Sequence, residues 1–267
     1  MNKLHYDHFF TIGKTHLVCE DYATQGDKPM PFIVLCDGCS SSKDSDIGAR
    51  ILALATKHIV ENAAEWPMDY APFGQKLILT ALDIVEKMHL TTNVLDATVM
   101  LAFVQQEAIQ VYVYGDGCLF FKDLEGNVGT IEIIFTHNAP FYLSYWPDKA
   151  RQEEYADYEP KPLLLKDSVN GLSEPLPFQK PLVFSLPLAK FPVVAIASDG
   201  AAHFIDATQT AKVPLFNIAN SLLDFKNVEG EFVKRRSKRA LEQYAQRNIF
   251  PADDLSVGVF VQSVEDT

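Results

Sequence analysis

The chain has 267 residues, 48% of them hydrophobic, and a formal net charge of −12. This length fits one large domain or two small ones, and the hydrophobic content is enough for a substantial core. The acidic balance argues against a general nucleic-acid binder, which needs a basic surface. No stretch approaches the apolar length of a membrane span, so we expect contact with neither nucleic acid nor membrane.

The cysteines indicate where the protein works. They are Cys19, Cys36, Cys39 and Cys118, and they lack the spacing of a disulfide framework. The N-terminus has no apolar segment of the kind that a secretory signal contains. We therefore expect a reducing compartment and a cytoplasmic protein.

The first part of the chain predicts short strands. Residues 1–18 alternate between polar and apolar side chains, most clearly from His5 to Ile12, which predicts a first strand. Residues 16–19 predict a second short strand that ends at Glu20-Asp21. A turn follows at 25–31, where Gly, Asp and Pro gather. Residues 32–36 are five apolar residues in a row, which is typical of a strand buried on both faces.

Two helices are expected next, because apolar residues recur at helical spacing over 46–64 and 70–89. Asp46 is the expected N-cap of the first. Four closely spaced strands then predict a meander, at 97–104, 108–114, 119–122 and 131–136. Two successive helices between strands do not form a simple βαβ repeat. The pattern favours an α+β layered sandwich with largely antiparallel sheets.

Residues 137–190 are rich in proline, aromatic and charged residues, and only two short strands are expected there, near Leu163 and Leu182. A long irregular segment inside a compact domain usually serves as a lid or binding loop. The alternative is a disordered insert, but the aromatic side chains need a surface to pack on. Two more helices, at 213–224 and 231–246, and a strand at 255–262 complete the chain without an internal repeat or a linker.

Acidic residues recur at the ends of the predicted strands. Asp37, Asp116 and Asp199 each follow an apolar run and precede glycine, and Asp253 precedes the last strand. Each Asp-Gly alone is typical of a turn. If the acids converge, two carboxylates at ~4 Å repel by about 1 kcal/mol in water and by about 4 kcal/mol at an effective dielectric near 20. Such a cluster takes up protons or cations.

Oxygen ligands without a matching set of histidines or thiolates favour Mg²⁺ or Mn²⁺ over Zn²⁺. One aspartate can bridge two ions about 3.5–4 Å apart, the spacing used for in-line displacement at phosphorus. Asp37 suits that role, with the unshielded carbonyl of Gly38 beside it. The remaining histidines, His203 among them, show no ligand spacing as a set, and we expect them to be structural or exposed.

The order and spacing of six motifs resemble those of the metal-dependent protein phosphatases, the PPM or protein phosphatase 2C family, of bacterial type. The motifs are Glu20-Asp21, Val34-Leu35-Cys36-Asp37-Gly38, Asp96-Ala97-Thr98, Gly115-Asp116-Gly117, Ser198-Asp199-Gly200 and Asp253-Asp254-Leu255-Ser256. The resemblance implies a four-layer α-β-β-α sandwich, in which two mostly antiparallel sheets are flanked by helix pairs. It implies a single domain over 1–267 with a variable, flap-like insert at about 137–190.

The resemblance also implies a metal centre of two Mg²⁺ or Mn²⁺ ions, with a third at Asp116 and Asp199. Asp37 would bridge two ions, and Asp37, Asp199 and Asp253 would be the catalytic set. The implied metal ligands are Glu20, Asp21, Asp37, Gly38, Asp116, Asp199 and Asp253. The implied activity is hydrolysis of phosphoserine and phosphothreonine in proteins by a metal-bridged hydroxide that attacks phosphorus directly. A kinase that phosphorylates the same substrate is the implied partner.

Three positions depart from the family pattern. His16 stands at the position of the phosphate-binding arginine and lacks the bidentate fork of arginine. Cys39 replaces a common histidine, and Asp254 replaces a common asparagine. These departures keep two alternatives open. One is a catalytically weak regulatory module of the same fold that binds phosphoproteins, and the other is a hydrolase of small phosphoesters.

Overall fold

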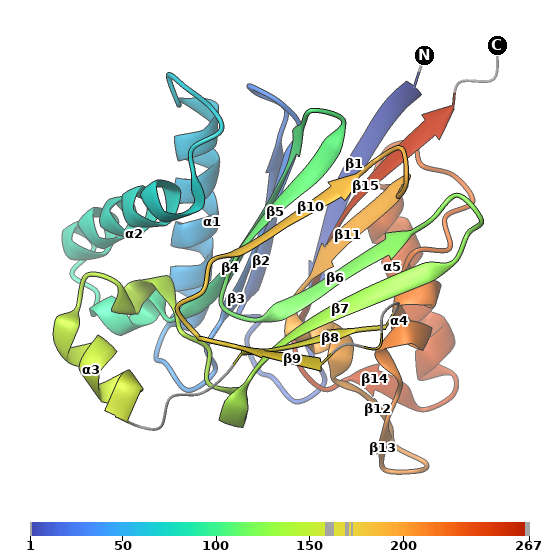
Figure 1. Ribbon diagram of the computed structural model, residues 1–267. Coiled ribbons are helices and arrows are strands. Elements are labelled where there is room, and N and C mark those ends of the chain that lie inside the picture. The colour runs from blue at the N-terminus through green and yellow to red at the C-terminus, as the bar shows by residue number, and fades with distance from the viewer. Residues whose placement is uncertain (1, 158–162, 169–170, 172, 265–267) are drawn as a thin grey trace.

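Two antiparallel sheets face each other, and helices cover their outer faces (Figure 1). The computed structural model describes residues 2–157, 163–168, 171 and 173–264. Within these residues the layers run helix, sheet, sheet, helix, which confirms the expected α-β-β-α sandwich. None of the described helices combines the length and the apolar character that a membrane crossing requires.

The five-stranded sheet carries the first helix pair. Its strands, in spatial order, are β10 (Leu182–Pro187), β5 (Ala108–Tyr114), β4 (Ala97–Gln105), β3 (Phe32–Gly38) and β2 (Asp21–Gly26). Helices α1 (Ser45–Glu61) and α2 (Tyr70–Lys87) cover it on one side. The strand β3 is buried on both faces, as expected: Val34 packs toward the helices and Ile33 toward the other sheet.

The seven-stranded sheet carries the second helix pair. Its strands, in spatial order, are β1 (Asn2–Thr11), β15 (Leu255–Val264), β11 (Val193–Ala197), β6 (Gly117–Lys122), β7 (Val128–Phe135), β8 (Leu163–Asp167) and β9 (Ser173–Leu176). Helices α4 (Leu215–Leu222) and α5 (Phe232–Ala245) pack on it. Leu35, Met100, Leu119 and Phe260 belong to the buried cluster between the two sheets.

Short elements connect these layers. A small sheet contains β13 (Ala211–Lys212), β12 (Phe204–Asp206) and β14 (Ile249–Pro251). Single helical turns are η1 (Thr92–Leu95), η2 (Thr136–Asn138), η3 (Leu143–Tyr145) and η4 (Asp199–Ala202).

The expected meander is wrong in one respect, because β4 and β5 lie in one sheet and β6 and β7 in the other. The chain crosses between the sheets at Gly115-Asp116-Gly117. Gly115 and Gly117 have φ of 121° and 129°, a backbone region that favours glycine. The crossover leaves Asp116 at the boundary of the two sheets.

The N-terminal boundaries also differ from expectation. No strand forms at 16–19, and β2 begins at Asp21 instead of ending there, because Asp21 pairs with Asp37 on β3. Helix α1 begins at Ser45 after Asp44, so Asp46 lies in its first turn and is not the N-cap. Long-range pairing decides the position of β2, and residue alternation alone could not reveal it.

Residues 137–190 are more regular than expected. They contain α3 (Lys149–Asp157), β8, β9 and β10. The strands expected near Leu163 and Leu182 are therefore confirmed, whereas the prediction of a long irregular segment is wrong. Strand β10 pairs with β5 at the edge of one sheet, and β8 pairs with β7 in the other. These strands have weak periodicity of their own, and the open edges of the two sheets supply their hydrogen bonds.

Candidate metal centre

Asp21 and Asp37 enter the site from neighbouring strands. They lie directly opposite each other in the register of β2 and β3, and Asp37 also lies opposite Thr98 on β4. Asp21 is almost fully buried, with 1% of its surface exposed. Two carboxylates thus meet at one end of the five-stranded sheet, as the sequence predicted for Asp37.

Asp199 and Asp253 reach the same place from the seven-stranded sheet. Strand β11 ends at Ala197 just before Asp199, and β15 begins at Leu255 just after the two aspartates. Because β11 and β15 are antiparallel neighbours, the end of one lies beside the start of the other. A Cβ on Gly200 would lie 1.7 Å from the Asp254 carbonyl oxygen, so only glycine permits this approach.

Ser198 ties the two sheets together at the site. Its hydroxyl donates a hydrogen bond of 2.7 Å to Asp21 Oδ2 and accepts one of 2.9 Å from the backbone N–H of Ser256. The first residue of the Ser198-Asp199-Gly200 motif therefore orients an acid of the opposite sheet. The other oxygen, Asp21 Oδ1, is buried and has no hydrogen-bond partner among the described residues.

Asp116 is held by the strand beside it. The Thr98 hydroxyl donates a hydrogen bond of 2.6 Å to Asp116 Oδ1, and the carboxylate is buried. Thr98 belongs to the Asp96-Ala97-Thr98 motif, so the structure supplies a physical reason for that motif. Asp116 and Asp199 are close enough for the charge of Asp199 to raise the pKa of Asp116.

The electrostatics of the cluster favour a cation. Burial raises the pKa of Asp21 to about 8 and the pKa of Asp116, with help from Asp199, to about 7. Burial raises the pKa of Asp37 well above its ordinary value, and the charges of Asp21, Asp199, Asp116 and Asp253 raise it further. Without cations, Asp21, Asp37 and Asp116 hold protons more tightly than free aspartates do. Together with the unpartnered Asp21 Oδ1, this shows that the donor set fits hard divalent ions.

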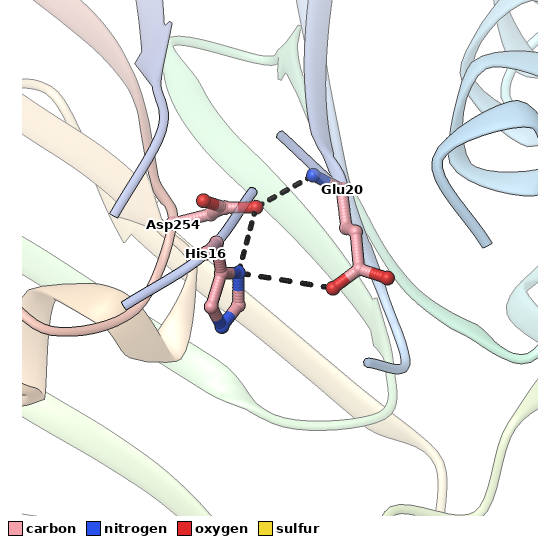
Figure 2. Close-up of side chains that lie close together, drawn as sticks. All are labelled: His16, Glu20 and Asp254. Atoms are coloured by element: carbon pink, nitrogen blue, oxygen red, sulfur yellow. Dashed lines mark hydrogen bonds and ion pairs between the residues drawn. The ribbon is translucent and has the colours of Figure 1, made fainter. Parts of the chain in front are cut away.

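Three carboxylates surround the His16 ring, and Figure 2 shows two of them, Glu20 and Asp254. Its Nδ1 is 3.2 Å from Asp254 Oδ2 and 3.7 Å from Glu20 Oε2, and its Nε2 is 3.3 Å from Asp253 Oδ1. Asp254 is 2% exposed, and its two oxygens each accept a hydrogen bond of 2.6 Å, from the backbone N–H groups of Gly13 and Glu20. Asp254 thereby ties the loop that carries His16 and Glu20 to the start of β15.

His203 occupies a second acidic pair, which sequence reasoning missed. Its Nδ1 lies 3.5 Å from Asp199 Oδ2 and 3.7 Å from Asp253 Oδ2. The sequence had grouped His203 with the structural or exposed histidines, and the structure places it beside two of the predicted metal ligands. The spacing was a usable signal, because His203 follows Asp199 by four residues and one helical turn brings such residues together.

A groove opens beside the acids. It has a volume of about 830 Å³, and Cys39, Ser41, Tyr142 and Arg151 are among its lining residues. Asp96, from the same motif as Thr98, fixes the wall of this groove. It receives two hydrogen bonds from Arg151 Nη2, at 2.8 and 3.0 Å, and others from the hydroxyls of Ser42 and Ser144.

Comparisons with known proteins agree with this fold. The family model described as Protein phosphatase 2C matches residues 13–244. A bacterial serine phosphatase has a similar fold, with a TM-score of 0.60 at 14% identity over 99% of this chain and 100% of that chain. The catalytic domain of the serine threonine protein phosphatase PstP, in complex with 2 manganese ions, has a TM-score of 0.56 at 15% identity over 99% and 100%.

The serine/threonine phosphatase Stp1 from Staphylococcus aureus is also similar, with a TM-score of 0.58 at 14% identity over 99% of this chain and 96% of that chain. At such identities the structural matches show a shared fold alone. No curated protein matches the sequence significantly.

Proposed function

The chain belongs to the protein phosphatase 2C family, and from this premise we propose which of its residues dephosphorylate phosphoserine and phosphothreonine in proteins. Family membership makes it a metal-dependent serine/threonine protein phosphatase. The observation that carries the proposed site is the convergence of acids whose pKa values are raised by burial and by one another's charges. The proposal includes a kinase that phosphorylates the substrate and, because all four thiols are free, a cytoplasmic location.

The proposed ligands are the acids described above. Asp37 would bridge two ions, and Gly38 would offer its carbonyl oxygen. Asp199 and Asp253 would complete the coordination shell of one ion, and Glu20 and Asp21 would bind the second. Asp116, with Asp199, would hold a third. Bound Mg²⁺ or Mn²⁺ would lower the pKa of an attacking water and offset the charge on the phosphoryl oxygens.

Other side chains hold this set in place. Ser45, at the start of α1, donates a hydrogen bond of 2.7 Å to Glu20 Oε1, so the helix fixes one proposed ligand. Ser198 does the same for Asp21. Rigid support of this kind allows the acids to keep their positions with and without ions.

His16 is the proposed phosphate-binding residue at the family's arginine position. The surrounding carboxylates favour its protonated form, in which a ring N–H can donate to a phosphate oxygen. The groove beside Cys39 is the proposed site for the substrate polypeptide. No feature of the described residues favours the regulatory module or the small-phosphoester hydrolase over a protein phosphatase.

The test is hydrolysis of a phosphothreonine peptide and of p-nitrophenyl phosphate with Mn²⁺, with Mg²⁺ and with EDTA. We expect metal-dependent turnover of the peptide that EDTA abolishes. Asp199→Asn should reduce it by more than about a hundredfold, because the variant loses a ligand charge. Metal binding by calorimetry without turnover would contradict the proposal and favour a regulatory module.

A further inference from the structure

The histidine that the family resemblance does not assign, His203, faces two proposed ligands of one ion. Its ring nitrogen Nδ1 is buried and has no hydrogen-bond partner in the described part of the chain. Two acceptors nevertheless face this atom, Asp199 Oδ2 at 3.5 Å and Asp253 Oδ2 at 3.7 Å. The nitrogen and the two oxygens therefore face one another at distances longer than a normal hydrogen bond.

This spacing is slightly longer than that of ligands around a shared ion. Ligand atoms about 2.0–2.2 Å from a metal lie roughly 3–3.5 Å from one another, depending on the coordination geometry. The three ligand atoms of Asp199, His203 and Asp253 all lie within 4.8 Å of one another. Small side-chain adjustments would therefore bring all three onto one ion.

The cluster in Figure 2 is a weaker candidate for the same role. His16, Glu20 and Asp254 also lie close together. Both oxygens of Asp254 already accept hydrogen bonds of 2.6 Å from backbone N–H groups, and Oδ2 also lies 3.2 Å from His16 Nδ1, so Asp254 has little capacity left to bind an ion. Asp199 and Asp253, in contrast, are partly exposed, and each turns one carboxylate oxygen toward His203.

We propose that His203 Nδ1 is a direct ligand of the ion held by Asp199 and Asp253, and that this nitrogen gives the centre a preference for Mn²⁺ and Co²⁺ over Mg²⁺. The inference rests on the proposed metal centre. Mg²⁺ prefers oxygen ligands and near-ideal octahedral geometry, whereas imidazole suits first-row transition metals. Replacing one oxygen ligand by imidazole therefore weakens the binding of Mg²⁺ more than the binding of Mn²⁺ or Co²⁺.

Calorimetry on the metal-free, full-length protein tests the selectivity. We expect Mn²⁺ to bind more tightly than Mg²⁺, and His203→Asp to reduce the ratio of the two affinities by about tenfold or more. His89→Asn is the matched control, because His89 is exposed and its positive φ of 57° is one that asparagine tolerates. An unchanged ratio in His203→Asp would overturn the inference.

Pulsed electron paramagnetic resonance with one equivalent of Mn²⁺ tests the nitrogen directly. Modulation from a bound nitrogen should be present in the wild type, in His89→Asn and in His16→Asn, and absent in His203→Asn. If His203→Asn does not fold, His16→Asn labelled with ¹⁵N-histidine gives the answer, since the label must change the modulation. Modulation that is absent in the wild type, or that persists in folded His203→Asn, would contradict the inference.

The two proposals fail in different ways. If no divalent ion binds and EDTA has no effect on turnover, the proposed function fails. If ions bind and turnover depends on them, but His203 variants keep the wild-type selectivity and nitrogen signal, only the role of His203 is wrong.

Discussion

At the scale of single residues, two adjacent aspartates have different roles. Asp253 turns one oxygen toward His16 and the other toward His203, and its side chain is 34% exposed. Asp254 is buried and accepts two backbone hydrogen bonds, from Gly13 and Glu20. Asp253 is thus placed for the proposed ion, whereas Asp254 fixes the loop that carries the ligands.

This difference predicts that Asp254→Asn destabilises the metal-free protein by about 1–3 kcal/mol, because asparagine offers one acceptor oxygen and its amide opposes the second backbone N–H. Urea unfolding followed by circular dichroism measures the loss. Asp253→Asn is the comparison, and it should weaken Mn²⁺ binding without a similar loss of metal-free stability. Equal stability of the two variants would show that Asp254 does not anchor the loop.

At the scale of elements, one buried acid fixes α3 beside the site. Asp96 accepts two hydrogen bonds from Arg151 of α3 and one of 2.6 Å from Ser144 of η3. The Arg151 guanidinium also lies over the Tyr145 ring, 4.1 Å from its centroid. These contacts hold one wall of the groove against the loop that follows Asp37.

We expect Arg151→Ala to raise KM for a phosphothreonine peptide by about tenfold or more and to change hydrolysis of p-nitrophenyl phosphate much less, because only the larger substrate needs the wall. The protein should also lose about 1–3 kcal/mol of stability, since Asp96 keeps its buried charge without the arginine. Lys149→Ala, an exposed change on the same helix, is the control. Equal effects on both substrates would mean that Arg151 does not shape peptide binding.

At the scale of the whole molecule, the acidic centre makes stability depend on pH. Burial raises the pKa of Asp21 to about 8 and of Asp116 to about 7, from an ordinary 3.8. The folded state therefore binds protons that the unfolded state releases. This contribution to stability is full below the unfolded pKa and is lost as the pH rises through the folded pKa values.

The metal-free protein should accordingly be less stable at about pH 8.5 than at about pH 6, by roughly 1–3 kcal/mol. Mn²⁺ should offset the loss at high pH, because cations replace the protons. Urea unfolding at both pH values, with EDTA and with Mn²⁺, gives the comparison. A metal-free protein that gains stability between these pH values would contradict the clustering of the acids.

Much of the fold could be read from the sequence because the evidence is local. The apolar run of β3 and the helical spacing in α1 and α2 predict those elements to within a few residues. The crossover at Gly115-Asp116-Gly117 could not be read, since a turn between strands looks the same whether or not the strands share a sheet. Strand β2 was misplaced because its pairing with β3 decides its position.

In the site, the sequence by itself determined that aspartates lie at the ends of strands, because a buried strand that ends in Asp-Gly leaves a carboxylate at the end of the sheet. Only the tertiary structure placed His203 between Asp199 and Asp253, Arg151 on Asp96, and Asp254 on the loop at Gly13. The last contact joins residues 241 positions apart. No local pattern records such a pairing, since it arises only when two sheets pack and bring both ends of the chain to one place.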